Sequence, residues 1–359
     1  MADDAPPSSS KKSGPRVPRN WIVTASLVVI ALCIGGAALA YMRDILTPLL
    51  IAIFLYFLIQ PLVETLFAWK LPQWILYLLL IMIPIATVLI MVWVVDINVR
   101  AFAEDLPKYR DKLEGVVDKA AVYAGYANDA GTFDWEQYSL GEFFDFSQKS
   151  LVESALHTTL KVVEVTVLTV FYLLFLFLEA RKFKGRVQSG FDAETSERIL
   201  GVMNTVDDNI RQYLWIKTAV SFGLGLTTAI LGWLFGLNFW LLWGIVMFLA
   251  NYITYVGSIV ALAPPIALAL VQFDSWVAAI ILGLLLIVNR TIWIDYAEIR
   301  YSGEHLDVSP LLLLLSIALL GWIWGVVGML LAVPLVTSTK IVLSHFDNTR
   351  SIAKLMSDD

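Results

Sequence analysis

Apolar residues gather in eight long stretches of the chain, separated by polar connections. About 20 helical residues cross a bilayer core of ~30 Å. Six stretches have this length and are predicted to be membrane-spanning helices: 21–41, 45–67, 74–95, 158–178, 213–235 and 275–294. The other two, 239–272 and 310–343, are too long for one ordinary crossing and short for two.

Glycine and polar residues break both long stretches in the middle. The first break, 251–257, reads NYITYVG, and the second, 321–328, reads GWIWGVVG. Irregular backbone at membrane depth is tolerated only where protein or a water-filled cavity satisfies it, and broken helices of this kind form binding sites in transporters. The two breaks are therefore the strongest indication of function in the sequence.

The two broken stretches allow two topologies. If each is one kinked crossing, the chain has eight spans. If each is a re-entrant hairpin, the chain has six spans and two hairpins. The alternatives place the loop 295–309 on opposite sides of the membrane, outside in the first and inside in the second.

The charges of the polar segments predict which of them face the cytoplasm. Segment 96–157 carries twelve acidic and six basic residues, which predicts an extracytoplasmic helical segment. The connection 179–212 begins with a basic cluster and is expected in the cytoplasm. The same rule predicts a disordered cytoplasmic tail at 1–20 and a cytoplasmic tail at 344–359. The remaining parts are N-terminal transmembrane helices at 21–95 and a transport domain at 158–343.

The composition excludes an ordinary soluble protein. Hydrophobic residues make up 58% of the chain and charged residues only 16%, whereas soluble domains contain about 25% charged residues. The predicted fold class is an all-α polytopic membrane protein. The single cysteine, Cys33, excludes an intramolecular disulfide.

Apolar residues in the acidic segment repeat with the spacing of a heptad. They are Phe102, Leu106, Tyr109, Leu113, Val116, Ala120 and Tyr123. The pattern predicts an amphipathic helix that begins near Pro107, because proline is tolerated best in the first helical turn. This helix either lies on the membrane or on its own domain, or associates with other protomers.

No motif in the sequence predicts catalysis. There is no His-Glu-x-x-His, no Gly-x-Ser-x-Gly and no phosphate-binding glycine loop. We therefore expect no enzymatic activity, no ATP hydrolysis on this chain, no metal or cofactor, and no nucleic-acid partner. The expected partners are the lipid bilayer, a small polar solute and, in one alternative, sodium or protons.

Ionisable residues inside membrane spans are costly and mark functional sites by default. Lys161 and Glu164 share one helical face and are expected to pair with each other. Lys217 is expected to extend to the inner interface. Arg290 either lines a polar pathway or pairs with Asp295 or Glu298. Glu164 and Asp295 are the candidates for exchanging a proton or coupling an ion.

The first break offers side-chain donors and acceptors that suit a small, polar, uncharged ligand. In the second break, glycines allow close backbone approach, either for a hairpin bend or for a helix–helix contact through small residues. The predicted substrate-binding residues are Asn251, Tyr252, Thr254, Tyr255, Gly257, Asn289, Arg290, Gly325 and Gly328.

Five stretches carry a resemblance to a known family. They are PLLIAIFLYFLIQP at 48–61, DLPKY at 105–109, FYLLF at 171–175, YITYVG at 252–257 and GWIWGVVGMLLAVP at 321–334. In these stretches the chain resembles the autoinducer-2 exporter family of bacterial membrane proteins. It departs from the family at Thr254 and Ile299, where the family commonly has proline.

The resemblance implies a homo-oligomeric, pentameric transporter of the bacterial inner membrane with paired re-entrant hairpins. Some members of the family are linked to export of the quorum-sensing signal autoinducer-2, a small polar diol, and others to sodium/proton exchange. The leading prediction is an exporter of a small polar metabolite such as autoinducer-2 that works by alternating access. The alternatives are a cation/proton antiporter and a membrane scaffold that does not transport.

Overall fold

The computed structural model describes residues 21–68, 72–124, 148–254, 256–298, 300, 308–346 and 349–357. Every regular element in these ranges is a helix: α1 Trp21–Tyr41, α2 Arg43–Ala68, α3 Gln73–Ala124, α5 Gln148–Gly190, α6 Ala193–Leu234, α7 Trp240–Ala250, α8 Gly257–Gln272, α9 Trp276–Arg290, η1 Thr291–Glu298, α11 Pro310–Trp324, α12 Val326–Ser344 and α13 Arg350–Leu355. The predicted tail at 1–20 lies outside the described residues.

Six helices of the described part are long and apolar enough to cross a membrane. Their apolar parts are Arg43–Pro61, Leu78–Asp105, Thr158–Ala180, Ala193–Leu234, Trp276–Glu298 and Val326–Ser344. The first five coincide with predicted spans, and the sixth is the second half of a broken stretch. The predicted all-α polytopic membrane fold is thus confirmed.

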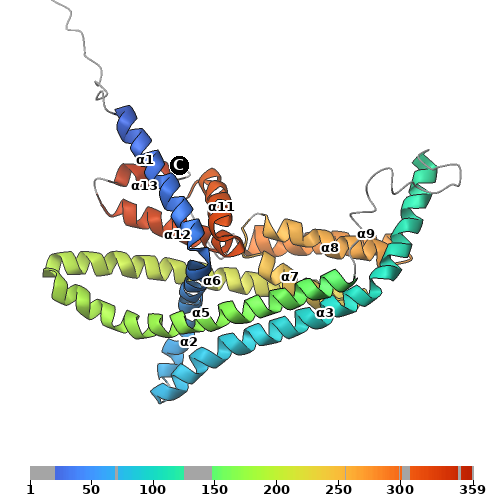
Figure 1. Cartoon of the computed structure of the whole chain (residues 1–359), viewed down its shortest axis with the longest axis horizontal. Coiled ribbons are helices and arrows are strands. Elements are labelled where there is room, and N and C mark those ends of the chain that lie inside the picture. Colours follow the sequence, from blue (N-terminus) through green and yellow to red (C-terminus); the bar gives the residue numbers. More distant parts are fainter. Residues whose placement is uncertain are drawn as a thin grey trace, which may run out of the picture.

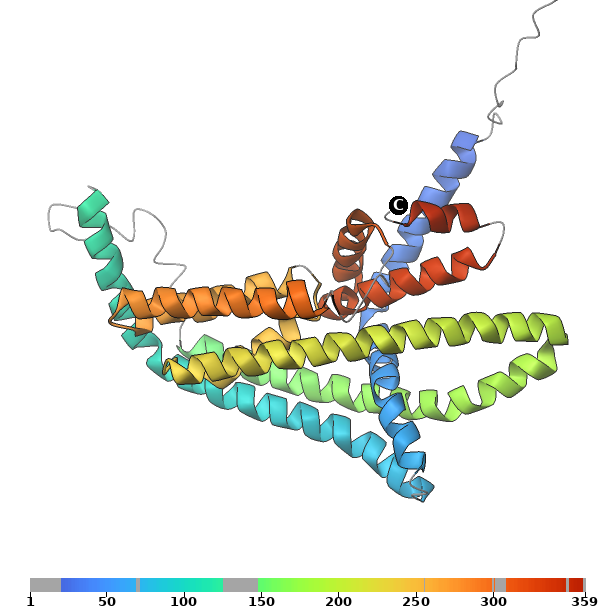
Figure 2. The ribbon, with the colours of Figure 1, turned by 180° about the vertical axis from the view of Figure 1, so that it is seen from behind.

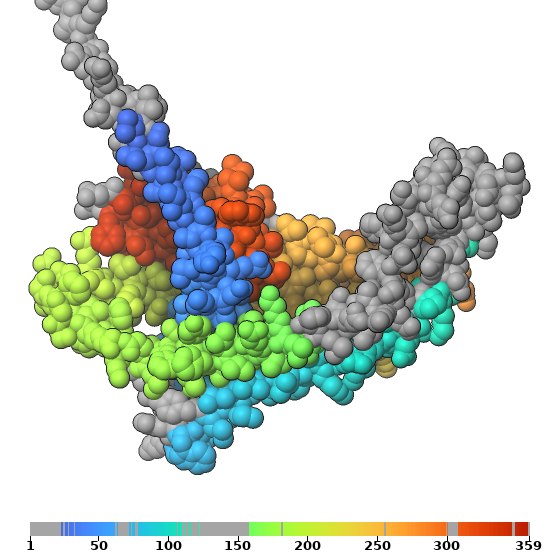
Figure 3. All heavy atoms as spheres, in the orientation of Figure 1, coloured from blue at the N-terminus to red at the C-terminus, as the bar shows by residue number. Residues whose placement is uncertain are grey.

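Figure 1 shows the arrangement of these helices. Helices α3, α5, α6, α8 and α9 run along the long axis of the molecule, and α2 crosses this layer. The space-filling view in Figure 3 shows α1 on the outside of the molecule, against α11. The core lies among α6, α7, α8 and α9, where Leu224, Met247 and Leu282 are completely buried.

Three helices extend far beyond the thickness of a bilayer. Helix α3 has 52 residues, α5 has 43 and α6 has 42, which at 1.5 Å per residue gives about 60–80 Å. The polar connection 179–212 is therefore a pair of antiparallel helical ends that project from the molecule (Figure 2). At the turn, the Thr195 N–H donates to the Asp192 carboxylate (2.9 Å), which lowers the pKa of Asp192.

The heptad residues belong to a longer helix than the sequence predicted. A helix starting near Pro107 was expected, but Pro107 lies inside α3, which runs without interruption from the predicted span into the acidic segment. A proline in a helix interior removes one backbone hydrogen bond and bends the helix without ending it. Figure 1 shows that α3 changes direction towards its C-terminal end.

The first heptad residues pack on their own chain. The ring of Phe102 lies 5.6 Å from that of Phe239, and Tyr109 is buried in the main core. The hydroxyl of Tyr109 accepts a hydrogen bond from Asn238 Nδ2 at 2.7 Å. This part of the heptad therefore rests on its own domain, which is one of the two predicted alternatives. Association with other protomers stays a prediction.

These contacts predict different costs for two substitutions of Tyr109. We expect Tyr109→Phe to cost about 1 kcal/mol of stability, because the exposed Asn238 can bond to water instead. Tyr109→Ala should cost about 3–5 kcal/mol, because it also empties a buried aromatic site. Thermal unfolding of the detergent-solubilised protein measures both. Equal losses for the two variants would show that the ring does not pack as described.

The first broken stretch is a helical hairpin of α7 and α8. Gln272, at the end of α8, accepts from the Asn238 N–H (2.8 Å) and donates to the Gly236 carbonyl (2.7 Å), just before α7. Lys112 of α3 donates to the Gln272 carbonyl at 3.1 Å. Both ends of the hairpin thus lie at the end of the molecule that carries the polar part of α3.

The second broken stretch is a hairpin of α11 and α12 that starts and ends near the other end of the molecule. The Ser309 N–H, before α11, donates to the Met356 carbonyl next to α13 (2.9 Å). Arg198, in the polar part of α6, donates to the His345 carbonyl after α12 (2.8 Å). The residues before loop 295–309 lie against α6 and those after it against the end of α13, and the side of the membrane on which this loop emerges stays a prediction.

Candidate functional site

Gly257 makes the first break possible. A Cβ atom at this position would lie 1.8 Å from the Ala250 carbonyl oxygen and 2.9 Å from Ile253 Cβ. No other residue allows the end of α7 and the start of α8 to approach so closely. Residues 251–254 and 256 lie between the two helices in turns and bends, and Tyr255 is outside the described residues.

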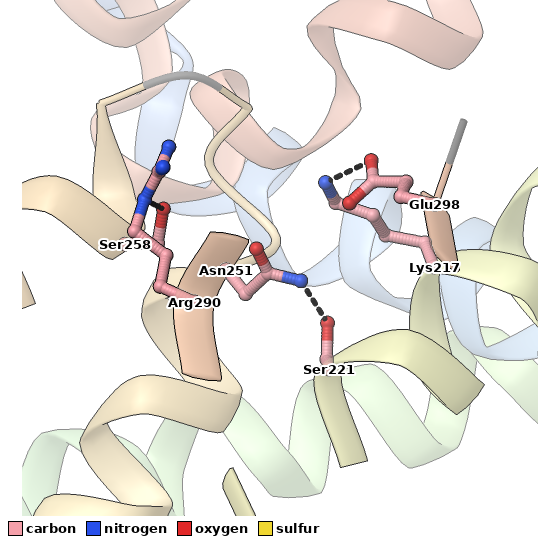
Figure 4. A network of polar contacts seen from close by, with 6 residues as sticks. All are labelled: Lys217, Ser221, Asn251, Ser258, Arg290 and Glu298. Carbon is pink, nitrogen blue, oxygen red and sulfur yellow. Dashed lines mark hydrogen bonds and ion pairs between the residues drawn. The ribbon is translucent and has the colours of Figure 1, made fainter. Parts of the chain in front are cut away.

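The first break contacts a row of hydroxyl groups on α6. Asn251 Nδ2 donates to Ser221 Oγ at 2.9 Å, as Figure 4 shows, and the Tyr252 hydroxyl donates to Thr218 Oγ1 at 2.8 Å. Asn251 is only 2% exposed and Tyr252 only 8%. The break thus brings neutral hydrogen-bonding groups into the interior of the helical layer.

Farther along α6, two more hydroxyl groups contact side chains of α9 and η1. Asn289 Oδ1 accepts from Thr227 Oγ1 (2.7 Å), and Asn289 Nδ2 donates to Thr228 Oγ1 (3.1 Å). Trp293 Nε1 donates to Thr227 Oγ1 at 3.1 Å. The indole ring lies directly over Gly223, where a Cβ would be 2.2 Å from a ring atom. We call Thr218, Ser221, Thr227 and Thr228 the α6 polar row.

The α6 polar row was not predicted from the sequence. A usable signal was present, because Lys217, Ser221 and Thr228 recur at spacings of four and seven residues on one face of an apolar helix. The hydroxyls also bond to their own helix, as Thr218 does to the Leu214 carbonyl (2.6 Å). Single serines and threonines in a membrane helix are therefore easily read as structural.

Two ion pairs flank the polar row. Arg290 lies 3.6 Å from Asp295, and its Nε donates to Ser258 Oγ at the start of α8 (3.1 Å). Pairing of Arg290 with Asp295 was one of the predicted alternatives and is confirmed. Asp295 belongs to the π-helix η1, which follows α9 directly and in which backbone hydrogen bonds join residues five apart. Arg290 and Asp295 have this spacing.

The second ion pair joins α6 to η1 and corrects a prediction. Lys217 was expected to extend to the membrane interface, but its side chain is only 3% exposed and its Nζ lies 2.6 Å from Glu298 Oε1. A buried lysine needs a counter-charge, and Glu298 provides one within the protein. Figure 4 shows Asn251 between this pair and the Arg290–Ser258 contact.

Each break also contains one buried polar atom without a partner among the described residues. Thr254 Oγ1 is such an atom in the first break, and Trp324 Nε1 is the other, next to Gly325 of the second break. Buried polar groups in proteins are nearly always hydrogen-bonded, so each exception needs an explanation. Both atoms could bond to a polar ligand or to water that enters between the helices.

In the second break, two glycines allow neighbouring groups to approach the backbone closely. Gly325 has a φ angle of 64° and lies against the Arg43 guanidinium, and a Cβ at Gly328 would be 1.9 Å from the Leu320 carbonyl oxygen. Helix α2 therefore contacts the second break through Arg43 and the first through Phe54, whose ring lies 5.7 Å from that of Tyr252. Substrate contacts of Gly325 and Gly328 stay a prediction.

Glu164 and Lys161 are not part of this site. Both are exposed on α5, and the described part of the chain shows no ion pair between them, so the expected pairing is not seen. Of the predicted residues, Asn251, Tyr252 and Asn289 bond to side chains of α6, whereas Arg290 bonds on α8 to Ser258, the neighbour of Gly257. The structure adds Lys217, Glu298, Trp293, Ser258 and the α6 polar row.

Comparison with known proteins finds relatives along nearly the whole chain. The family model described as AI-2E family transporter matches residues 27–348. The chain is 27% identical over 345 residues to the AI-2 transport protein TqsA of Escherichia coli K12, covering 94% of this chain and 95% of that protein. It is 28% identical to a putative transport protein of Borreliella burgdorferi (91% and 88% covered) and 27% identical to one of Haemophilus influenzae (95% and 96% covered).

The match extends over both hairpins and the α6 polar row between them, so it includes every element that forms the site. A multi-pass membrane protein with two broken helices is the architecture expected of a transporter. The chain belongs to the AI-2E transporter family.

Proposed function

We propose that this protein moves a small, polar, uncharged solute across the membrane through a site between the first break and the α6 polar row. The observation that carries the proposal is the pair of buried contacts from Asn251 to Ser221 and from Tyr252 to Thr218. These groups are neutral, and each can donate or accept. A solute with hydroxyl groups can replace such contacts one for one at little net cost, because a typical intramolecular hydrogen bond is worth only about 1 kcal/mol.

The relative named AI-2 transport protein supports autoinducer-2 as the first solute to examine. A small diol presents the hydroxyl groups that the amide of Asn251 and the hydroxyl of Thr254 can bind. We further propose export across the bacterial inner membrane by a homo-oligomer, a pentamer by family resemblance, with both termini in the cytoplasm. The hydrophobic composition and the helical layer support the membrane location.

The contacts of α2 and α6 support alternating access as the mechanism. Helix α6 contacts both α7 and α12, so one helix joins the two hairpins. Helix α2 contacts both breaks, through Arg43 and Phe54. Rocking of α2 and the other N-terminal helices against the hairpins would therefore open the breaks to one side and then to the other.

Transport is tested with the full-length protein in proteoliposomes. Uptake of autoinducer-2 and of sodium should be measured side by side, with protein-free liposomes as control. We expect uptake of autoinducer-2 above the control. Sodium uptake without autoinducer-2 uptake would favour the cation antiporter, for which Asp295 and Glu164 are the candidate exchange groups. Absence of both fluxes would argue against the proposed function.

A substitution in the first break tests whether the transported solute binds at this site. Asn251→Ala is expected to reduce autoinducer-2 uptake about tenfold, because it removes a buried group that holds the solute, and the loss of one such bond is worth roughly 1–3 kcal/mol. The matched control is Asn209→Ala, which removes an amide from the exposed part of α6. Equal uptake by both variants and the wild type would place the solute elsewhere.

A further inference from the structure

We propose that Glu298 is a proton-binding site, and that proton binding at its free carboxylate oxygen weakens the ion pair with Lys217 that ties η1 to α6. This inference rests on the proposed function, since it supplies the ion that would be coupled to solute movement. It differs from the sequence-based candidates, because Glu164 is exposed and the Asp295 side chain is 50% exposed.

The two oxygens of Glu298 have different environments. Oε1 lies 2.6 Å from Lys217 Nζ, whereas Oε2 is buried and has no hydrogen-bond partner among the described residues. The side chain of Glu298 is 15% exposed and that of Lys217 is 3% exposed. A buried carboxylate oxygen without a donor is unfavourable, and a proton is the smallest species that neutralises it.

Among the described residues, the charged groups near Glu298 lie on α6, α9 and η1, and Arg300 follows two residues after it. Helix α6 contributes Lys217, with Arg211 and Tyr213 within two turns of it. Helix α9 ends in Arg290, whose charge is opposed by Asp295, the other acid of η1. Lys217 is the cation that the structure shows in contact with Glu298, at 2.6 Å. The pair is neutral as described and would carry one positive charge after proton binding.

The geometry favours a proton over a metal cation. Oxygen-binding cations such as Ca²⁺ and Mg²⁺ are held by six or more oxygen ligands at short distance, whereas only Oε2 is free here and an ammonium group lies on the other oxygen. In the proposed step a proton from water forms an O–H bond at Oε2. Lys217 keeps its own proton, and the ion pair becomes a weaker bond between an ammonium and a neutral acid.

Proton binding at Glu298 would reach the solute site through η1. The π-helix continues directly from α9 and carries Trp293, which bonds to Thr227, and the preceding α9 carries Asn289, which bonds to Thr227 and Thr228. When the Lys217–Glu298 ion pair is intact, η1 stays against α6 and the hydrogen bonds of Trp293 and Asn289 to α6 remain formed. When the pair weakens, η1 can move away from α6 and expose the α6 polar row.

The proposal is tested by infrared difference spectroscopy of the full-length protein in liposomes, between alkaline and acidic pH. We expect a protonated-carboxyl band that Glu298→Gln removes and Glu197→Gln, an exposed acid of α6, leaves unchanged. If Glu298→Gln fails to fold, Glu298→Asp replaces it in the test, because this variant should shift the frequency of the protonated-carboxyl band. An identical band in the wild type and the Glu298 variant overturns the proposal.

Flux measurements separate this proposal from the proposed function. Wild-type uptake of autoinducer-2 should respond to a pH gradient across the liposome, and Glu298→Gln should lose that response while the exposed control Glu197→Gln keeps it. Wild-type uptake that ignores the gradient overturns the coupling and leaves the transport proposal intact. The Glu298 band without any solute flux supports the proton site and overturns the transport proposal.

Discussion

Replacing Lys217 by methionine is expected to destabilise the protein by about 3–5 kcal/mol, because removal of one partner leaves the other charge of a buried ion pair unopposed. The effect should be large since Lys217 is almost fully buried and bonded to Glu298 at 2.6 Å. Methionine fills a similar volume, so the loss of stability would result from the missing charge and not from a cavity. Thermal unfolding of the detergent-solubilised protein measures it.

Two further variants show whether the pair is responsible. Lys161→Met, at an exposed position of α5, should leave the unfolding temperature nearly unchanged. The double variant Lys217→Met with Glu298→Gln should recover most of the stability, because neither member of the pair is then charged. If the double variant is as unstable as the single one, Glu298 is not the group that Lys217 neutralises.

Gly257→Ala is expected to reduce both the stability of the hairpin and transport. The added methyl group would lie 1.8 Å from the Ala250 carbonyl oxygen, a backbone atom that cannot move without opening the break. Forcing an atom into such a site costs about 1–3 kcal/mol, and sometimes more. Uptake of autoinducer-2 in proteoliposomes should fall further than stability alone explains, because Asn251 and Tyr252 would leave their partners on α6.

The control for this substitution is Gly201→Ala in the polar part of α6. A Cβ at Gly201 meets nothing within 4 Å, and alanine in a helix interior is more favourable than glycine by roughly 1 kcal/mol. This variant should be at least as stable as the wild type and transport equally well. Similar losses in Gly257→Ala and Gly201→Ala would show that the close approach of α7 and α8 is not required.

The hydropathy pattern predicted the fold well because it follows directly from the requirements of a bilayer. The spans at 45–67 and 158–178 correspond to α2 and α5, and the break at 251–257 separates α7 from α8 within one residue. Helix ends in the polar segments were harder to predict. Pro107 and the acidic residues suggested a separate helix, yet α3 continues through them. The packing of Phe102 and Tyr109 against the core stabilises this continuation, and such packing cannot be read from the local sequence.

The site was predicted in part. Asn251, Tyr252 and Gly257 were identified because polar residues and glycine are conspicuous inside an apolar stretch. Their partners Ser221 and Thr218 were missed, since one hydroxyl in a membrane helix can bond to its own backbone and carries little information. Tyr255 and the predicted contacts of Thr254 with solute stay predictions.

By itself the sequence determined that this chain is an all-helical membrane protein with two broken helices, since those properties depend on residues that are neighbours along the chain. Only the tertiary structure decided which ends of the hairpins meet, that Lys217 pairs with Glu298 and that Arg290 bonds to Ser258. These partners are 81 and 32 residues apart. Such pairings depend on how helices pack, and several charged or polar groups could have served as partners until the packing placed one of them within reach.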